Sequence, residues 1–213
     1  EIFEEAILSH VADGIIIGGQ FVTPQVEKLM LRYDFPQICI GAPAFETVLS
    51  WIDTNHTLSS NIAVEHLLSR GCGRLAFMGG REGDKIFMDR LRGFQIAMEK
   101  NGLEVRREQV VYNGPDVESI YQSALRLLEL PQPPDGIICT NSLMAVGTVR
   151  AIRAKGLAIP DQVSLVAFDD YPFSPMILPA PTVIDIDLYS LGTHAGSSLL
   201  KKIRNPAMLI QSY

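Results

Sequence analysis

The segment from residue 136 to residue 167 reads GIICTNSLMAVGTVRAIRAKGLAIPDQVSLVA, and it decides the fold class. Its two ends, 136–139 and 163–167, are short apolar runs typical of strands that are covered on both faces. Between them Ala145, Val149 and Ile152 recur at helical spacing, and Gly156 follows as a stop signal. A strand, a helix and a second strand in this order predict a right-handed crossover between parallel strands.

The same alternation extends along the rest of the chain. Apolar runs predict further strands at 14–17, 38–40, 50–52, 74–78, 110–112 and 182–184. Segments with a period near 3.6 predict further helices at 57–70, 85–101 and 188–204. Repeated strand–helix–strand units predict an α/β protein built on doubly wound parallel sheets.

The composition narrows the functional classes. Eighteen basic and twenty-four acidic residues give the 213-residue chain a net charge of -6. Nucleic-acid binding depends on Lys and Arg at phosphates, so this segment by itself is a poor DNA-binding surface. The N-terminus lacks the pattern of a secretory signal, and the isolated cysteines Cys39, Cys72 and Cys139 fit buried thiols in a reducing compartment. These features favour a cytoplasmic location.

Motifs for catalysis are missing from the sequence. It contains no GxSxG nucleophile elbow, no GxxxxGK[ST] phosphate loop and no GxGxxG dinucleotide turn. The four histidines do not occur at metal-ligand spacing. We therefore expect a protein that is not an enzyme and that needs neither a metal ion nor a cofactor.

Several blocks, taken in order, carry a resemblance to a known family. They are ADGIIIGG at 12–19, AVEHLLSRG at 63–71, RLAFMGG at 74–80, RLRGF at 90–94, PPDGIICTN at 133–141 and GLAIPDQVSLVAFDD at 156–170. Each block alone is weak, but their order and spacing over nearly the whole chain are specific. The sequence resembles the core of the lactose/galactose repressor (LacI/GalR) family.

The resemblance implies a fold like that of periplasmic binding proteins. It consists of two doubly wound subdomains joined by three crossovers, with a small-molecule effector in the cleft between them. It places residues 1–71 plus 187–203 in an N-terminal subdomain and 72–184 plus 204–213 in a C-terminal one. The chain begins at what resembles the second core helix, so the N-terminal subdomain is incomplete and the helix-turn-helix head is not in these residues.

Three residues are the main candidates for effector binding. Arg90 matches a cleft arginine of the family, and its guanidinium offers five donors suited to paired oxygens. Asp169 follows the strand at 163–167, where ligands gather in open α/β sheets. Asn141 matches a family asparagine near the effector, and it also suits the N-cap of the helix that it precedes.

Other positions are weaker candidates for the pocket wall. They are Asp53, Phe168 and Ile186, with Phe87, Tyr171 and Phe173 as further aromatic side chains near the expected cleft. Phe87 lies on a core stripe, which favours packing over ligand contact. Gly41 stands where the family commonly has a pocket aspartate, so the pocket is expected to be less polar than that of a generic sugar-binding relative.

These observations favour a ligand-gated transcriptional repressor. The effector, a sugar or sugar derivative, would alter the affinity for operator DNA, which a head outside these residues would bind, and the regulator would be a homodimer. The alternative is an extracytoplasmic sugar-binding protein of a transport system, which shares the core fold. The blocks at 156–163 and 167–170 favour the repressor.

Overall fold

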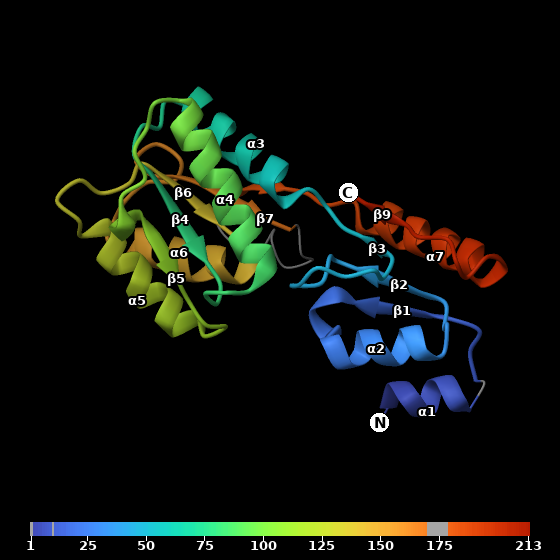
Figure 1. Ribbon diagram of the computed structural model, residues 1–213. Coiled ribbons are helices and arrows are strands. Elements are labelled where there is room, and N and C mark those ends of the chain that lie inside the picture. Colours follow the sequence, from blue (N-terminus) through green and yellow to red (C-terminus); the bar gives the residue numbers. More distant parts are fainter. Residues whose placement is uncertain (1, 10, 170–178) are drawn as a thin grey trace. The chain divides into compact units, whose positions relative to one another are not determined.

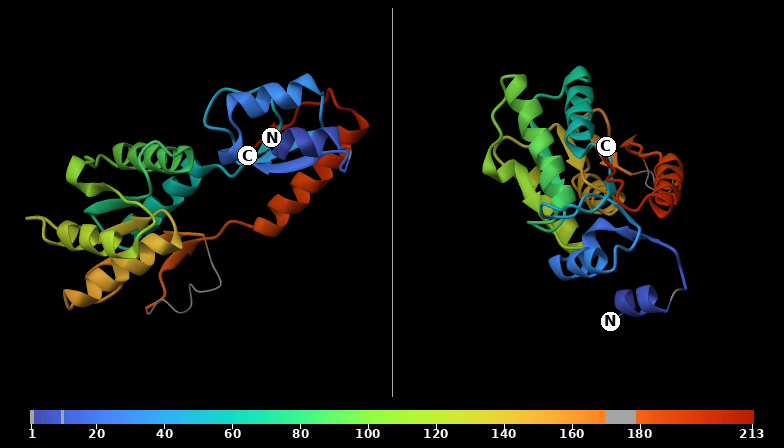
Figure 2. Two further views of the ribbon diagram at one scale, coloured as in Figure 1. Left: turned by 90° about the horizontal axis from the view of Figure 1, so that it is seen from below. Right: turned by 45° about the vertical axis from the view of Figure 1, so that its right-hand side comes forward.

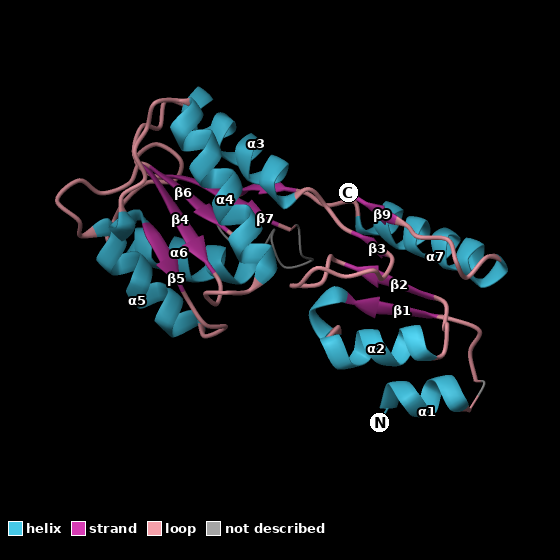
Figure 3. Ribbon diagram, in the orientation of Figure 1, coloured by secondary structure: helices cyan, strands magenta, loops and turns pink. Residues whose placement is uncertain are grey.

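The computed structural model describes residues 2–9, 11–169 and 179–213 (Figure 1). It separates into two compact units, Glu1–Asn55 with Asp187–Tyr213, and His56–Ile186. Each unit is built on one parallel sheet, and helices accompany both sheets (Figure 3). The predicted α/β class with two parallel sheets is confirmed.

The second unit contains a five-stranded sheet in the order β5-β4-β6-β7-β8, with every neighbouring pair parallel. Its strands are β4 (Leu75–Gly79), β5 (Val110–Tyr112), β6 (Gly136–Cys139), β7 (Ser164–Phe168) and β8 (Thr182–Ile184). Helices α3 (His56–Ser69) and α4 (Lys85–Lys100) cover one face, and α5 (Val117–Leu128) and α6 (Ser142–Ala154) cover the other (Figures 1 and 2). A short 3-10 helix, η2 (Arg107–Gln109), precedes β5.

The strands of this sheet are apolar throughout because both faces are covered. Successive residues of a strand point to opposite faces, so Phe77 packs with the α3–α4 layer and Met78 with the α5–α6 layer. The rings of Phe77 and Phe94 of α4 are 5.5 Å apart, and both side chains are fully buried. The uninterrupted apolar runs in the sequence therefore predict correctly that these strands are buried on both faces.

The first unit has a four-stranded parallel sheet in the order β1-β2-β3-β9. Its strands are β1 (Ile15–Gly18), β2 (Gln37–Ile40), β3 (Trp51–Ile52) and β9 (Gln211–Ser212), and its helices are α1 (Ile2–Leu8), η1 (Gly19–Phe21), α2 (Pro24–Arg32) and α7 (Leu188–Arg204). Cys39 packs with Met30 of α2, and Ile38 packs with Ala195 of α7, so these helices lie on opposite faces.

The unit boundaries differ from those that the resemblance implied. Segment 56–71 was expected in the first unit, but α3 packs against α4 through Gly93 and belongs to the second. Segment 204–213 was expected in the second unit, but β9 extends the first sheet by pairing with β3. By this division the chain passes between the units at 55–56 and at 186–187.

Helices α2 and α5 were not among the predicted segments, although both carry local signals. Thr23 and Asp116 accept hydrogen bonds from the first-turn backbone amides, as N-cap residues do. In α5, Ile120, Ala124 and Leu127 form the buried stripe. The three cysteines are buried as expected, and burial is the main cause that raises the pKa of Cys39 and of Cys139 to about 12.

Candidate functional site

The candidate site lies in the second unit, at the carboxyl ends of its central strands. The chain runs from β4 through α4 to β5 on one side, and then through α5 to β6 on the other side of β4. The strand order therefore reverses between β4 and β6, which is where open α/β sheets hold ligands. Helix α4 and the residues at the carboxyl ends of β6 and β7 supply the groups that gather there.

Arg90 lies in the second turn of α4 and is only 3% exposed. Its Nη1 donates a hydrogen bond to the carbonyl oxygen of Thr140, the residue that follows β6. Its Nη2 lies 3.4 Å from Oδ1 of Asp169, and its guanidinium carbon lies 4.1 Å from the ring centroid of Phe168. The arginine thereby joins α4 to the ends of β6 and β7.

Asp169 follows β7 directly and has a left-handed backbone conformation, with φ of 65°. Aspartate tolerates this region better than most residues, and neighbouring contacts hold it here. Its amide donates to the carbonyl oxygen of Ile184 over 3.1 Å, and its own carbonyl oxygen accepts from Ser142 Oγ over 2.9 Å. The side chain of Asp169 is 25% exposed, whereas that of Arg90 is 4% exposed. The carboxylate is therefore the member of the pair that a ligand reaches more easily.

Asn141 caps α6, because its Oδ1 accepts a hydrogen bond from the amide of Met144 over 2.9 Å. The capping role expected from the sequence is confirmed, and the effector-binding role of Asn141 stays a prediction. The neighbouring Ser142 is 1% exposed and bonds to the backbone of Asp169. The sequence pattern indicates no more than a helix-start position for Ser142, so its link to the strand end after β7 is a finding of the structure.

The three weaker candidates for the pocket wall divide between the two units. Phe168 is fully buried and lies beneath the guanidinium of Arg90, so it supports that side chain instead of offering an open stacking face. Asp53 lies in the first unit, where its carboxylate accepts from the amides of Ala42 and Thr54, both over 2.8 Å. Ile186 is half-buried at the end of the second unit.

Of the three remaining aromatic candidates, the structure describes only Phe87. The ring of Phe87 lies over Gly80, where an added Cβ would come within 2.0 Å of it, so this ring packs on the loop after β4. Tyr171 and Phe173 lie outside the described residues. Thr140 was not predicted, because it takes part through its backbone carbonyl, which no side-chain pattern reveals.

Two negative findings concern the described residues only. In those parts of the chain, no three His, Cys, Asp or Glu side chains come together in a way that would hold a metal ion. Within the same residues, no helix combines the length and apolar character needed to cross a membrane.

Comparison with known proteins identifies the family. A family model described as a periplasmic binding protein-like domain matches residues 64–212. The chain belongs to this family. The "Probable HTH-type transcriptional repressor ExuR" of Bacillus subtilis is 31% identical over 200 residues, which are 91% of this chain and 59% of that protein. The "Ribose operon repressor" of Halalkalibacterium halodurans is 27% identical over 199 residues, 93% of this chain and 58% of that protein.

A solved structure shows the same fold. The crystal structure of a regulatory protein of the LacI family from Chloroflexus aggregans superposes with a TM-score of 0.91 at 24% identity, covering 99% of this chain and 77% of that one. The family match and the two curated relatives, both named as repressors, confirm the resemblance to the core of the LacI/GalR family seen in the sequence. It spans about three fifths of the length of the curated relatives it matches.

Proposed function

We propose that this chain is the effector-sensing core of a DNA-binding transcriptional regulator and that it has no enzymatic activity of its own. A small polyhydroxylated molecule, a sugar or sugar derivative, binds at the carboxyl ends of β4, β6 and β7 and alters operator affinity. Operator DNA is bound by a head outside these residues, and the regulator acts as a cytoplasmic homodimer. The names of the relatives, which describe transcriptional repressors and a ribose operon, favour this function over the transport alternative.

The observation that carries the proposal is the pairing of Arg90 with Asp169, which are 79 positions apart in the sequence. The buried guanidinium fixes the carboxylate at the switch point of the sheet, and the carboxylate stays partly exposed. A carboxylate held in this way accepts hydrogen bonds from sugar hydroxyls without losing further side-chain entropy. In this arrangement Asp169 is the main contact with the effector, while Arg90 orients Asp169.

A thermal-shift screen of the intact protein with sugars, sugar acids, sugar phosphates and nucleosides tests the proposal. A ligand that binds only the native state raises the unfolding midpoint by mass action. We expect one compound class to give a shift that Asp169→Ala and Arg90→Ala both remove. The same compound should change the mobility of a promoter fragment in a gel-shift assay.

The chain offers a matched control for the arginine. Arg150 of α6 also stacks on an aromatic ring, with its guanidinium carbon 4.1 Å from the Tyr121 centroid, and it also pairs with an acid, Glu118, at 2.7 Å. Its side chain is 54% exposed, and it lies on the α5–α6 face of the sheet. Arg150→Ala should keep the ligand shift. A shift that survives in both Arg90→Ala and Asp169→Ala would refute the assigned site.

The proposed homodimer has a separate test. Helix α3 exposes Leu58 and Ile62, which lie one turn apart with 55% and 51% of their surface exposed. Exposed apolar residues on one helix face are typical of subunit contacts. Ile62→Arg should convert the dimer to a monomer in light-scattering measurements, with an unchanged circular dichroism spectrum. A monomeric unsubstituted protein would exclude this part of the proposal.

A further inference from the structure

A second pocket lies within the first unit, apart from the residues discussed above. It has a volume of about 250 Å³ and forms where the start of β2, the end of α2, the loop before β3 and the segment after α7 meet. Buried Met30 and Leu49 line it, and its rim carries exposed apolar side chains: Leu31, Val48, Met208 and Leu209. These side chains suit the apolar body of a ligand, and polar groups make up much of the rest of the lining.

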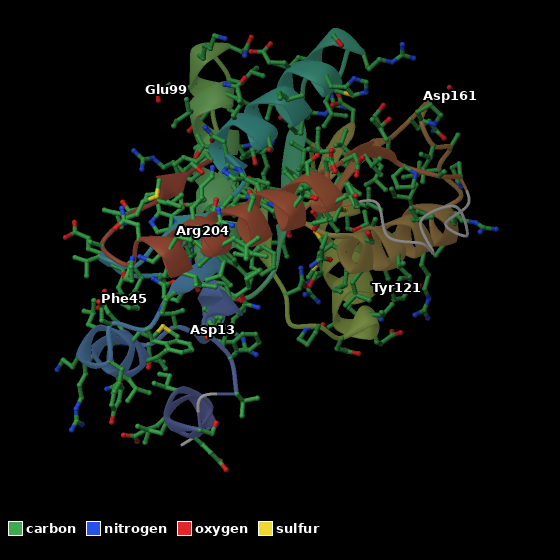
Figure 4. The ribbon with its side chains drawn as sticks, turned by 90° about the vertical axis from the view of Figure 1, so that its right-hand side faces the viewer. Asp13, Phe45, Glu99, Tyr121, Asp161 and Arg204 are labelled. Carbon is green, nitrogen blue, oxygen red and sulfur yellow. The ribbon has the colours of Figure 1, made fainter. Side chains whose placement is uncertain are left out.

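The polar side chains of the lining belong to Lys202, Gln37 and Asp34. Lys202 lies in the last turn of α7 and is 9% exposed. Helix α7 ends at Arg204, which is labelled in Figure 4 and marks this end of the helix. The Lys202 ammonium donates to the carbonyl oxygens of Pro206 over 3.1 Å and of Met208 over 2.9 Å. An ammonium has three N–H donors, so one is left after these two bonds. Within the described part of the chain, no carboxylate lies within ion-pair distance of Lys202 Nζ.

Gln37 is the second polar group, and it is 2% exposed. Its Oε1 accepts a hydrogen bond from the Sγ of Cys39 over 3.5 Å. The Cys39 thiol is a reliable donor, because burial, together with the nearby Glu27, raises its pKa to about 12. With its oxygen occupied, the amide of Gln37 has its NH₂ group left to donate, and that group has no acceptor among the described residues.

Two donors without a protein acceptor lie in one pocket, and one of them is a cation, so an acceptor that carries negative charge is favoured there. We propose that this pocket binds a small carboxylate with an apolar body, whose oxygens accept from Lys202 and Gln37 while its body packs on Met30 and Leu49. Pockets for drug-sized ligands have volumes of about 300 Å³ or more, so this smaller pocket suits a smaller molecule. Desolvation lowers the pKa of Lys202, and a bound carboxylate would compensate that cost.

Asp34 modulates the proposed site. It lies at the pocket wall after α2 with φ of 46°, and its negative charge acts on Lys202 from beyond ion-pair distance. It therefore repels a ligand carboxylate. Asparagine also adopts this backbone region readily, so Asp34→Asn removes the charge and keeps the turn. The substitution should strengthen carboxylate binding.

Saturation-transfer NMR on the intact protein tests the site with 3-phenylpropionate and its neutral analogue, 3-phenylpropionamide. We expect transfer to the carboxylate and at least tenfold weaker binding of the amide, since a hydrogen bond to a charged group contributes about 1.5–3 kcal/mol. Lys202→Met should weaken the binding of 3-phenylpropionate by a similar factor, and Asp34→Asn should strengthen it.

A rim variant keeps the test independent of folding. Val48 is 63% exposed, so Val48→Trp fills the mouth of the pocket without disturbing the core. It should abolish transfer to the carboxylate and leave the unfolding midpoint unchanged. No transfer to the carboxylate in the unsubstituted protein, equal binding of acid and amide, or transfer that persists in Val48→Trp would each overturn the proposal.

Discussion

Replacing Gly93 by alanine tests the packing that positions Arg90. Gly93 lies on α4, one turn after Arg90, at the contact with α3. A Cβ at this position would lie 2.3 Å from the carbonyl oxygen of Thr57 and 2.9 Å from the Cβ of Ser60. A carbon and a carbonyl oxygen need roughly 3.3 Å, so the helices would have to separate by about 1 Å.

The expected magnitude follows from two opposing effects. Alanine in a helix interior is favoured over glycine by about 1 kcal/mol. Overpacking costs about 1–3 kcal/mol, and the upper end applies because the nearest atoms belong to the backbone and cannot rotate away. The net loss in the free energy of unfolding is then about 2 kcal/mol, or roughly 4–8 °C in midpoint for a chain of this size.

Thermal and urea unfolding, followed by circular dichroism, measure this loss. Gly196→Ala in α7 is the matched control, because nothing lies within 4 Å of the position that its Cβ would take and only the helix preference acts. Gly196→Ala should raise stability by up to about 1 kcal/mol. If Gly93→Ala is as stable as the unsubstituted protein, the close contact of α3 with α4 is wrong. The separation of α3 from α4 should also displace Arg90, and the rise in unfolding midpoint that the effector causes should then be smaller.

Three further predictions concern thiols, a cap and the core. Because burial raises their pKa to about 12, Cys39 and Cys139 should resist iodoacetamide at pH 8 in the native protein and react after unfolding, as mass spectrometry would show; rapid native labelling would contradict their burial. Asn141→Ala should cost about 1 kcal/mol in urea unfolding and Asn141→Asp much less, and equal losses would argue against the cap. Phe94→Ala should cost about 3–5 kcal/mol by the same measurement, because the ring is fully buried against Phe77; a loss below about 1 kcal/mol would exclude this packing.

The candidate site shows how far residue patterns reach. Asp169 was predicted because an acid directly after a buried strand lies at the ligand-binding edge of a parallel sheet. That Arg90 serves the same site followed from a family resemblance and not from spacing, since 79 positions separate the two residues, and their direct contact is a finding of the structure. The link from Ser142 to Asp169 and the carbonyl of Thr140 were missed, because backbone partners leave no mark in the sequence.

The sequence by itself determined most of the strands, most of the helices and the two-sided burial of the sheets, since these depend on local periodicity and on glycine and cap signals. Only the tertiary structure decided which unit each segment joins. Helix α3 belongs with α4 because Gly93 permits a close helix contact, and β9 joins the first sheet because the edge of β3 offers it backbone partners. The second pocket is likewise tertiary, because Gln37 and Lys202 meet only when α7 packs against the sheet that contains β2. Such contacts depend on shape and free hydrogen-bonding groups brought together by folding, and these are not encoded in any local stretch of residues.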